Sequence, residues 1–193
     1  NKAFTLDSNL AEVHTVVGDI EAWHQYNWEL CEKELKRAIE LNPNYAEAYY
    51  NHANALKDLS KIEEAIEKYD RAIIANPTLI KAHHNRAHCF RKLKNFQTAL
   101  TGYTKVISLD SNHAEAYYQR GKSFNDLNAH NQAIEDYEQA IKIKPDYAKA
   151  YSNLLFNLNY KTDFDSNVYL LEAKKFRLNC KSIKKKLNLK HQH

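Results

Sequence analysis

A step of 34 residues recurs along this chain and constrains its fold more than any other feature. The largest side chain in the repeating pattern is a tyrosine, found at Tyr69, Tyr103 and Tyr137. The same step relates further positions: Ala65, Ala99 and Ala133; Leu56, Phe90, Phe124 and Leu158; and Pro43, Pro77 and Pro145, with Ser111 at the step between the last two. A fixed period of this length is typical of stacked repeats, because one such unit cannot bury its own apolar face. The sequence therefore predicts a solenoid.

Within one period the apolar residues indicate two amphipathic helices. In residues 46–79, Tyr49, Ala53 and Leu56 are spaced for one helical face, and a second set with spacings of three and four runs from 62 to 73. Asn76-Pro77 ends the second helix, because proline cannot continue the hydrogen-bond ladder and its predecessor avoids the α region. Each period is therefore predicted to be a helical hairpin.

The small, aromatic and proline positions of this hairpin are Ala53, Ala65, Tyr69, Ala72 and Pro77. This pattern resembles the tetratricopeptide repeat, and it recurs in 80–113 and in 114–147, where Gly121 supplies the small residue. The resemblance implies an all-α fold, a right-handed superhelix of the α-solenoid type.

The repeat phase also predicts how the chain is organised. Residues 1–160 form the repeat array: a partial unit 1–10, units 11–45, 46–79, 80–113 and 114–147, and a half unit 148–160. Unit 11–45 is one residue longer than the 34-residue units, and the extra residue is expected in the turn between its two helices, at 24–27. Residues 161–193 are predicted to form a long capping helix with a basic tail. Because the chain opens on Asn1 rather than Met, we expect it to be a fragment.

The capping helix has a narrow apolar seam of six residues: Tyr169, Ala173, Phe176, Cys180, Ile183 and Leu187. The seam is expected to cover the last repeat, and an overhanging end could instead pair with a second copy or a partner helix. From Lys174 onward there are eight Lys or Arg and no acidic residue. This charge is interpreted as a solvated face rather than a membrane-binding or nucleic-acid-binding one, because no base-stacking platform accompanies it.

A second resemblance concerns residues 152–160 and 163–165. They are similar to the junction between the repeat array and the catalytic region of O-GlcNAc transferase-like proteins. The family continues with a histidine-containing stretch, whereas this chain has Glu172, Ala173 and Lys174 there. The chain also stops far short of a nucleotide-sugar-binding domain. The resemblance implies at most the non-catalytic, substrate-reading arm of such an enzyme, so the chain itself is predicted not to be an enzyme.

Composition and motifs favour a binding protein. No apolar run is long enough to span a bilayer and no leader opens the chain. Cys31, Cys89 and Cys180 are odd in number and far apart, which fits a reducing, cytoplasmic setting. There is no phosphate loop, and His84 and His88 lack a third ligand at a useful spacing, so neither a metal nor a cofactor is predicted.

The resemblance to tetratricopeptide repeats implies that the first helices line a concave groove. Their sixth positions carry four side-chain amides, Asn51, Asn85, Gln119 and Asn153. An amide offers donors and an acceptor, so this ladder could hold the backbone of an extended peptide. A comparable asparagine ladder is what the O-GlcNAc transferase family uses.

Eight further residues are predicted to face the groove: Tyr50, Asn54, Lys81, His84, His88, Arg91, Tyr118 and Lys122. The cationic members favour an acidic, extended partner. We therefore predict a scaffold for protein–protein interaction that binds a peptide in its groove, with the transferase arm as the alternative.

Overall fold

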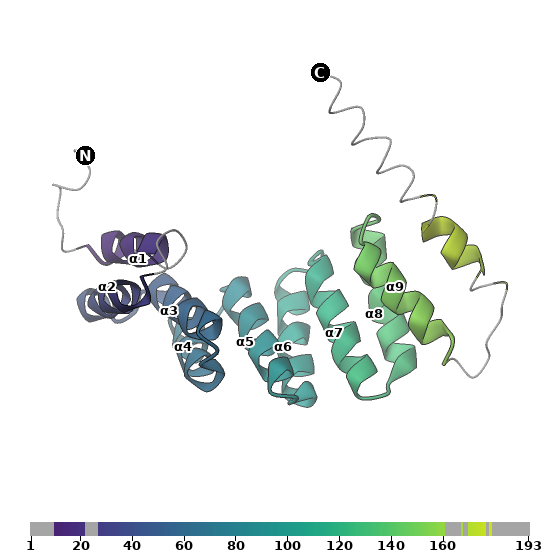
Figure 1. Cartoon of the computed structure of the whole chain (residues 1–193), viewed down its shortest axis with the longest axis horizontal. Coiled ribbons are helices and arrows are strands. Elements are labelled where there is room, and N and C mark those ends of the chain that lie inside the picture. The colour runs from purple at the N-terminus through teal and green to yellow at the C-terminus, as the bar shows by residue number, and fades with distance from the viewer. Residues whose placement is uncertain (1–9, 22–26, 161–166, 168–169, 177, 179–193) are drawn as a thin grey trace, which may run out of the picture. The chain divides into compact units, whose positions relative to one another are not determined.

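The computed structural model describes residues 10–21, 27–160, 167, 170–176 and 178. In this part of the chain the regular structure is helical throughout, without a strand. The described residues fall into two compact units, one within Asn1–Asn95 and the other within Phe96–His193. We call them unit 1 and unit 2, and Figure 1 labels the helices of both.

Unit 1 contains five of the labelled helices. They are α1 (Ala11–Ile20), α2 (Trp28–Leu41), α3 (Ala46–Asp58), α4 (Ile62–Ala75) and α5 (Ile80–Lys92). Each helix packs mainly on the next one along the chain, and α1 also reaches α3. This nearest-neighbour packing is what a stack of helical hairpins requires.

Unit 2 repeats the arrangement. Its helices are α6 (Phe96–Leu109), α7 (Ala114–Asp126), α8 (His130–Ile143) and α9 (Ala148–Leu158), again packed in chain order. The two-helix period predicted from the sequence is thus present, and the all-α solenoid class is confirmed.

An Asx turn ends the second helix of three successive periods. The side chains of Asn42, Asn76 and Asp110 accept hydrogen bonds from the backbone N–H two residues on, at 3.1, 3.1 and 2.9 Å. These residues are 34 apart, so the turn is part of the repeat. An Asx turn satisfies backbone donors that the finished helix leaves open and starts the next connection.

The first helix of a period ends in a different turn. Ser60, Lys94 and Asn128 have φ of 62°, 59° and 58°, the left-handed region. In each case the next residue donates its N–H five residues back, as Lys61 does to Leu56 O at 2.9 Å. This is the Schellman arrangement, which lets the chain reverse directly into the second helix.

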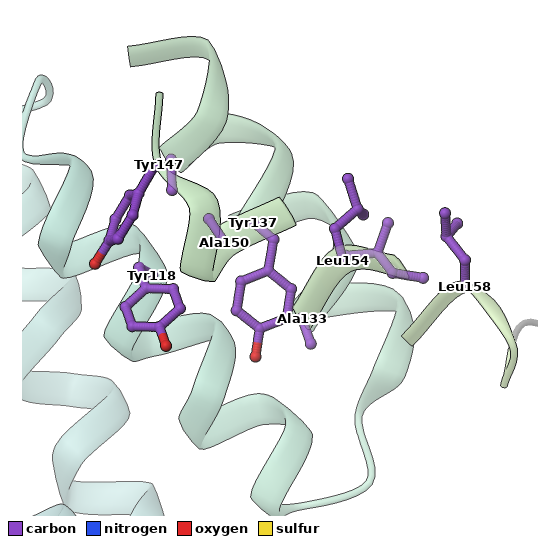
Figure 2. Packing of buried hydrophobic residues seen from close by; sticks show 9 residues of the cluster. Tyr118, Ala133, Tyr137, Tyr147, Ala150, Leu154 and Leu158 are labelled. Carbon is purple, nitrogen blue, oxygen red and sulfur yellow. The ribbon is translucent and has the colours of Figure 1, made fainter. Parts of the chain in front are cut away.

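The core is built from the tyrosine and alanine of the 34-residue pattern. Tyr69, Tyr103 and Tyr137 are fully buried, as are Ala65, Ala99 and Ala133. Figure 2 shows the ring of Tyr137 beside that of Tyr118, with centroids 6.0 Å apart. Small residues let two helices approach closely while the tyrosine fills the space between them.

One buried ion pair ties three helices of unit 2 together. Arg120 on α7 donates two hydrogen bonds to the Asp136 carboxylate on α8, at 2.7 and 2.8 Å, and a third to Thr104 on α6 at 3.1 Å. Its hydrogen bond to Asp136 raises the pKa of Arg120, whereas burial raises the pKa of Asp136 against the pull of the guanidinium. Since the geometry is bidentate, the pair fixes the angle between these helices.

The end of the chain is helical at residues 170–176. The Phe176 ring packs against Tyr151 on α9 with centroids 5.2 Å apart. The capping helix over residues 161–193 stays a prediction. Leu170 and Leu171 are half-exposed. The remaining seam positions, Tyr169, Cys180, Ile183 and Leu187, lie outside the described residues, as do 1–9 and the expected bulge at 24–26.

Two further sequence expectations concern thiols and membranes. Burial raises the pKa of the free thiols Cys31 and Cys89 to about 11, so both behave as small apolar groups. Cys180 lies outside the described residues. Among the helices that the structure describes, none combines the length and apolarity that crossing a bilayer requires.

Candidate functional site

The predicted site residues of unit 1 lie on its two first helices, α3 and α5. Tyr50, Asn51 and Asn54 belong to α3; Lys81, His84, Asn85, His88 and Arg91 belong to α5. We call this set the α3–α5 surface. Lys81 is exposed and the others are half-buried.

Asn85 joins the two helices of this surface. Its Nδ2 donates to Asn54 Oδ1 at 2.9 Å and to the Tyr50 hydroxyl at 3.3 Å. Asn54 Oδ1 also accepts from the Tyr69 hydroxyl at 2.6 Å. Both protons of the Asn85 amide nitrogen are therefore engaged within unit 1.

Asn51 occupies the equivalent position one repeat earlier and differs from Asn85. It is half-buried and forms no hydrogen bond with any described residue. Its amide keeps both donors and the acceptor. The two amides of this surface thus differ in what they can offer to a peptide backbone.

The charge of Lys81 is partly offset. Its ammonium lies 2.5 Å from a Glu47 carboxylate oxygen on α3 and 4.5 Å from the centroid of the Tyr50 ring. An acidic ligand would therefore compete with Glu47 for this lysine. The electropositive character expected of this strip is weaker at Lys81 than the sequence suggests.

His84 and His88 are four residues apart on α5, as their spacing predicts. Across the described residues, no group of three or more His, Cys, Asp or Glu side chains is arranged to hold a metal ion. The two histidines therefore count here as polar members of the α3–α5 surface.

In unit 2 the predicted residues lie on α7 and α9. Tyr118, Gln119 and Lys122 belong to α7 and Asn153 to α9, and we call this set the α7–α9 surface. Asn153 Nδ2 donates to the Tyr118 hydroxyl at 3.5 Å. The same contact, between residues 35 apart, joins Asn85 to Tyr50 in unit 1. An asparagine that reaches the tyrosine of the preceding first helix is thus a repeated feature of both units.

A carboxylate that was not predicted from the sequence, that of Glu115, connects residues of the α7–α9 surface. Glu115 Oε1 accepts from Gln119 Nε2 at 2.7 Å, and Glu115 Oε2 accepts from the Tyr147 hydroxyl. Burial and this carboxylate raise the pKa of Tyr147, and the Tyr147 ring lies 4.8 Å from that of Tyr118. Glu115 could have been predicted from its repeat position, because Glu47 occupies the same position two periods earlier and pairs with Lys81.

Gln119 replaces asparagine in the amide series, and its contacts differ accordingly. Its nitrogen is held by Glu115, while its buried Oε1 has no hydrogen-bond partner among the described residues. The Lys122 ammonium lies 5.6 Å from the Tyr118 ring centroid. The surface therefore combines an unpaired amide acceptor, an aromatic ring and a cation.

Three segments of the chain match sequence models described as tetratricopeptide repeat. The matched residues are 34–67, 80–113 and 114–147, which together make up just over half of the chain. No curated protein matches the sequence.

Solved structures resemble the fold at low sequence identity. A crystal structure of MamA has a TM-score of 0.76 at 22% identity, over 89% of this chain and 97% of that one. YrrB, described as a tetratricopeptide repeat protein with an unusual peptide-binding site, has a TM-score of 0.74 at 20% identity, over 92% of this chain and 90% of that one. PilF of Pseudomonas aeruginosa has a TM-score of 0.74 at 15% identity, over 88% and 76%.

The matched segments, the helical hairpins and the buried tyrosine–alanine core agree with one another. The chain belongs to the tetratricopeptide repeat family.

Proposed function

We propose that this chain is a protein-interaction scaffold whose α3–α5 surface and α7–α9 surface can each bind an extended peptide. Membership of the family supports the role of a protein-interaction scaffold, because repeats of this kind present helical surfaces to protein partners. The likeness to YrrB supports the fold, and that protein is described as having an unusual peptide-binding site.

The repeated hydrogen bond from asparagine to tyrosine is the observation that carries the proposal. Asn85 to Tyr50 and Asn153 to Tyr118 place an amide and a phenol together at the same repeat position in each unit. Because the amide nitrogen is held by the protein, the amide is pre-oriented, and its oxygen can accept from a peptide N–H without losing rotamer freedom. Asn51, which forms no hydrogen bond with a described residue, adds an amide that can both donate and accept.

The chemistry of the peptide follows from the side chains beside the amides. Lys81 and Arg91 on α5 and Lys122 on α7 favour an acidic segment, and the Tyr50 and Tyr118 rings favour apolar contact between the charges. Glu47 and Glu115 limit this preference, because Glu47 pairs with Lys81 and Glu115 accepts a hydrogen bond from Gln119. We therefore propose an extended peptide with acidic residues rather than a densely acidic one.

The test uses a peptide selected by the protein itself. The whole chain is immobilised and used to select from a random dodecapeptide phage library, and the selected peptide is measured by fluorescence anisotropy. Asn51→Ala combined with Asn153→Ala is expected to weaken binding at least about tenfold, the range for two hydrogen bonds in a partly desolvated site. Asn85→Ala is measured separately, since it also removes contacts inside unit 1.

Asn131→Ala is the matched control. Asn131 is exposed on α8, outside both surfaces, so affinity should stay unchanged. Circular dichroism of each variant checks that the fold is retained. Equal affinity of the Asn51/Asn153 double variant and the unaltered chain would remove the amide series from the proposal.

Two sequence hypotheses stand beside this proposal. The transferase-arm alternative rests on residues 152–160 and 163–165, and 161–166 lie outside the described residues. Self-association through the C-terminal helix is supported by the half-exposed Leu170 and Leu171. Both stay predictions.

A further inference from the structure

A pocket in unit 1 lies among α2, α3 and α4, and none of the residues proposed for peptide binding lines it. Its volume is about 470 Å³. Seven residues form its wall: Lys36, Ile39, Glu40, Tyr49, His52, Lys68 and Arg71. Three of these side chains are cationic and one is a carboxylate.

The buried histidine of this pocket is His52 on α3. It is only 4% exposed, and its Nδ1 has no hydrogen-bond partner among the described residues. Burial lowers the pKa of His52 to about 4, and the positive charge of Lys68 is the next largest cause. The charges of Lys36 and Lys61 also lower this pKa, whereas the Glu32 carboxylate raises it. At neutral pH the ring is therefore uncharged and keeps one N–H to donate.

Of the two ring nitrogens of His52, Nδ1 is the one that is buried without a hydrogen-bond partner among the described residues. Leaving a lone N–H donor buried is rarer in proteins than leaving an acceptor. We therefore assign the proton to Nε2 and leave Nδ1 as the buried acceptor. His52 then presents an N–H donor where it lines the pocket.

The cations of the pocket are only partly used by the protein. Lys36 is held by Glu32 at 2.7 Å, and the Glu40 carboxylate is held by Arg37 at 3.0 Å. Lys68 and Arg71 on α4 form no ion pair with a described residue. The Tyr49 hydroxyl likewise has no partner in the part of the chain that the structure describes. Donors and positive charge therefore dominate this wall.

We propose that this pocket binds a phosphate group, with His52 at its base and Lys68 and Arg71 as the cations that hold it. A phosphate carries up to two negative charges and several acceptor oxygens, so it can use two cations and uncharged N–H and O–H donors together. The guanidinium of Arg71 suits two of these oxygens at once. A metal ion does not suit the site, because its side chains are mainly cations and donors.

The phosphate could be free or carried by a phosphorylated side chain of a protein partner. The recognising chemistry is the same in both cases. This inference does not depend on peptide binding at the α3–α5 or α7–α9 surface, so either proposal can fail while the other holds.

The experiment follows the His52 imidazole resonances by NMR while sodium phosphate is added to the whole chain at pH 7. Ionic strength is kept constant with sodium chloride, and His52→Gln assigns the signal. A saturable shift of the His52 resonance is expected. Its pKa should rise from about 4 towards 6.5 with phosphate bound, because an adjacent anion stabilises the imidazolium.

Lys68→Gln combined with Arg71→Gln tests the cations without touching the core. The double variant should bind phosphate at least about tenfold more weakly, as expected when two charge-assisted hydrogen bonds are lost. Lys105→Gln with Lys142→Gln is the matched control. It removes the same charge from exposed positions on α6 and α8 and should leave binding unchanged.

A second arm separates the two sources. A phosphoserine pentapeptide and its unphosphorylated form are titrated in the same way. Tighter binding of the phosphopeptide than of inorganic phosphate assigns the site to a phosphorylated protein partner, and the reverse assigns it to the free ion. The proposal is overturned if neither phosphate probe gives a saturable shift. It is also overturned if the Lys68/Arg71 double variant responds like the unaltered chain, or if sodium chloride alone gives the same shift.

Discussion

At the scale of single residues, burial decides what a side chain does more than its type. Six histidines lie between His52 and His130, both included, yet His52 is the one whose ring is almost fully enclosed. Burial holds the pKa of His52 at about 4, below the value of 6.5 that applies in the unfolded chain. Between these two pH values the His52 imidazole is mainly protonated in the unfolded chain and mainly neutral in the folded chain.

The pH dependence of stability follows from this difference. The His52 contribution to the free energy of unfolding is fully present above pH 6.5 and is lost as pH falls towards 4. Its upper bound is about 3 kcal/mol, at 1.36 kcal/mol per pKa unit. Urea unfolding of the whole chain in phosphate-free buffer at pH 7 and pH 4.5 should show the loss, and His52→Gln should show a smaller one. An identical loss in both proteins would contradict the assignment.

At the scale of elements, the reversals between paired helices rest on single residues in the left-handed region. Ser60 ends α3 with φ of 62° and Asn128 ends α7 with φ of 58°. The hydrogen bonds from Ser60 N to Lys57 O and from Lys61 N to Leu56 O, at 3.0 and 2.9 Å, fix the turn after α3. A side chain at such a φ is strained, and glycine relieves the strain.

Ser60→Gly is therefore expected to raise the free energy of unfolding by about 0.5–1 kcal/mol, since the relief exceeds the entropy that glycine adds to the unfolded chain. Asn128→Gly is the matched comparison. Its gain should be smaller because asparagine tolerates this region better than serine. Both are measured by urea unfolding. Destabilisation by Ser60→Gly would show that the serine side chain stabilises the turn.

At the scale of the whole molecule, each helix packs mainly on its neighbours in the chain, so damage should stay local. Gly121 on α7 gives a way to test this. A Cβ added there would lie 2.8 Å from Tyr137 Cε1 and 3.2 Å from Ala133 O. Tyr137 is fully buried and cannot move away.

Gly121→Ala is expected to destabilise unit 2 by about 1–3 kcal/mol, the usual cost of overpacking, although alanine is the better helix former. Hydrogen exchange followed by mass spectrometry should show lost protection in α7 and α8 and unchanged protection in α3 and α4. Ala53 holds the equivalent position beside Tyr69 in unit 1, so the helix itself accepts alanine. Equal loss of protection in α3 and α4 would contradict local packing.

Most of the fold could be predicted from the sequence because it repeats. Tyr69, Tyr103 and Tyr137 are buried as their common phase requires, and Pro77 follows the end of α4. Asn76-Pro77 was predicted to end the second helix, but the form of the turns was not, although Asn42, Asn76 and Asp110, like Ser60, Lys94 and Asn128, are in phase too. Their residue types differ, so a pattern search for one amino acid passes over them.

The candidate site was predicted only as a set of positions. Sequence placed Asn51 and Asn85 at equivalent points of two helices. The sequence did not show that the Asn85 amide donates hydrogen bonds to Tyr50 and Asn54, whereas the Asn51 amide donates none to a described residue. Glu115 and its bonds to Gln119 and Tyr147 were missed for the same reason, since side-chain partners depend on distances between helices.

The sequence by itself determined the helical hairpin, its period and its buried face, because these follow from local spacing and from proline and small-residue positions. Tertiary structure alone decided which polar groups are paired within the protein and which are not. The enclosure of His52 beside Lys68 and Arg71 needs three helices from two periods, and no local pattern encodes it. Burial and pairing are properties of packed elements, so they appear only once the elements are in contact.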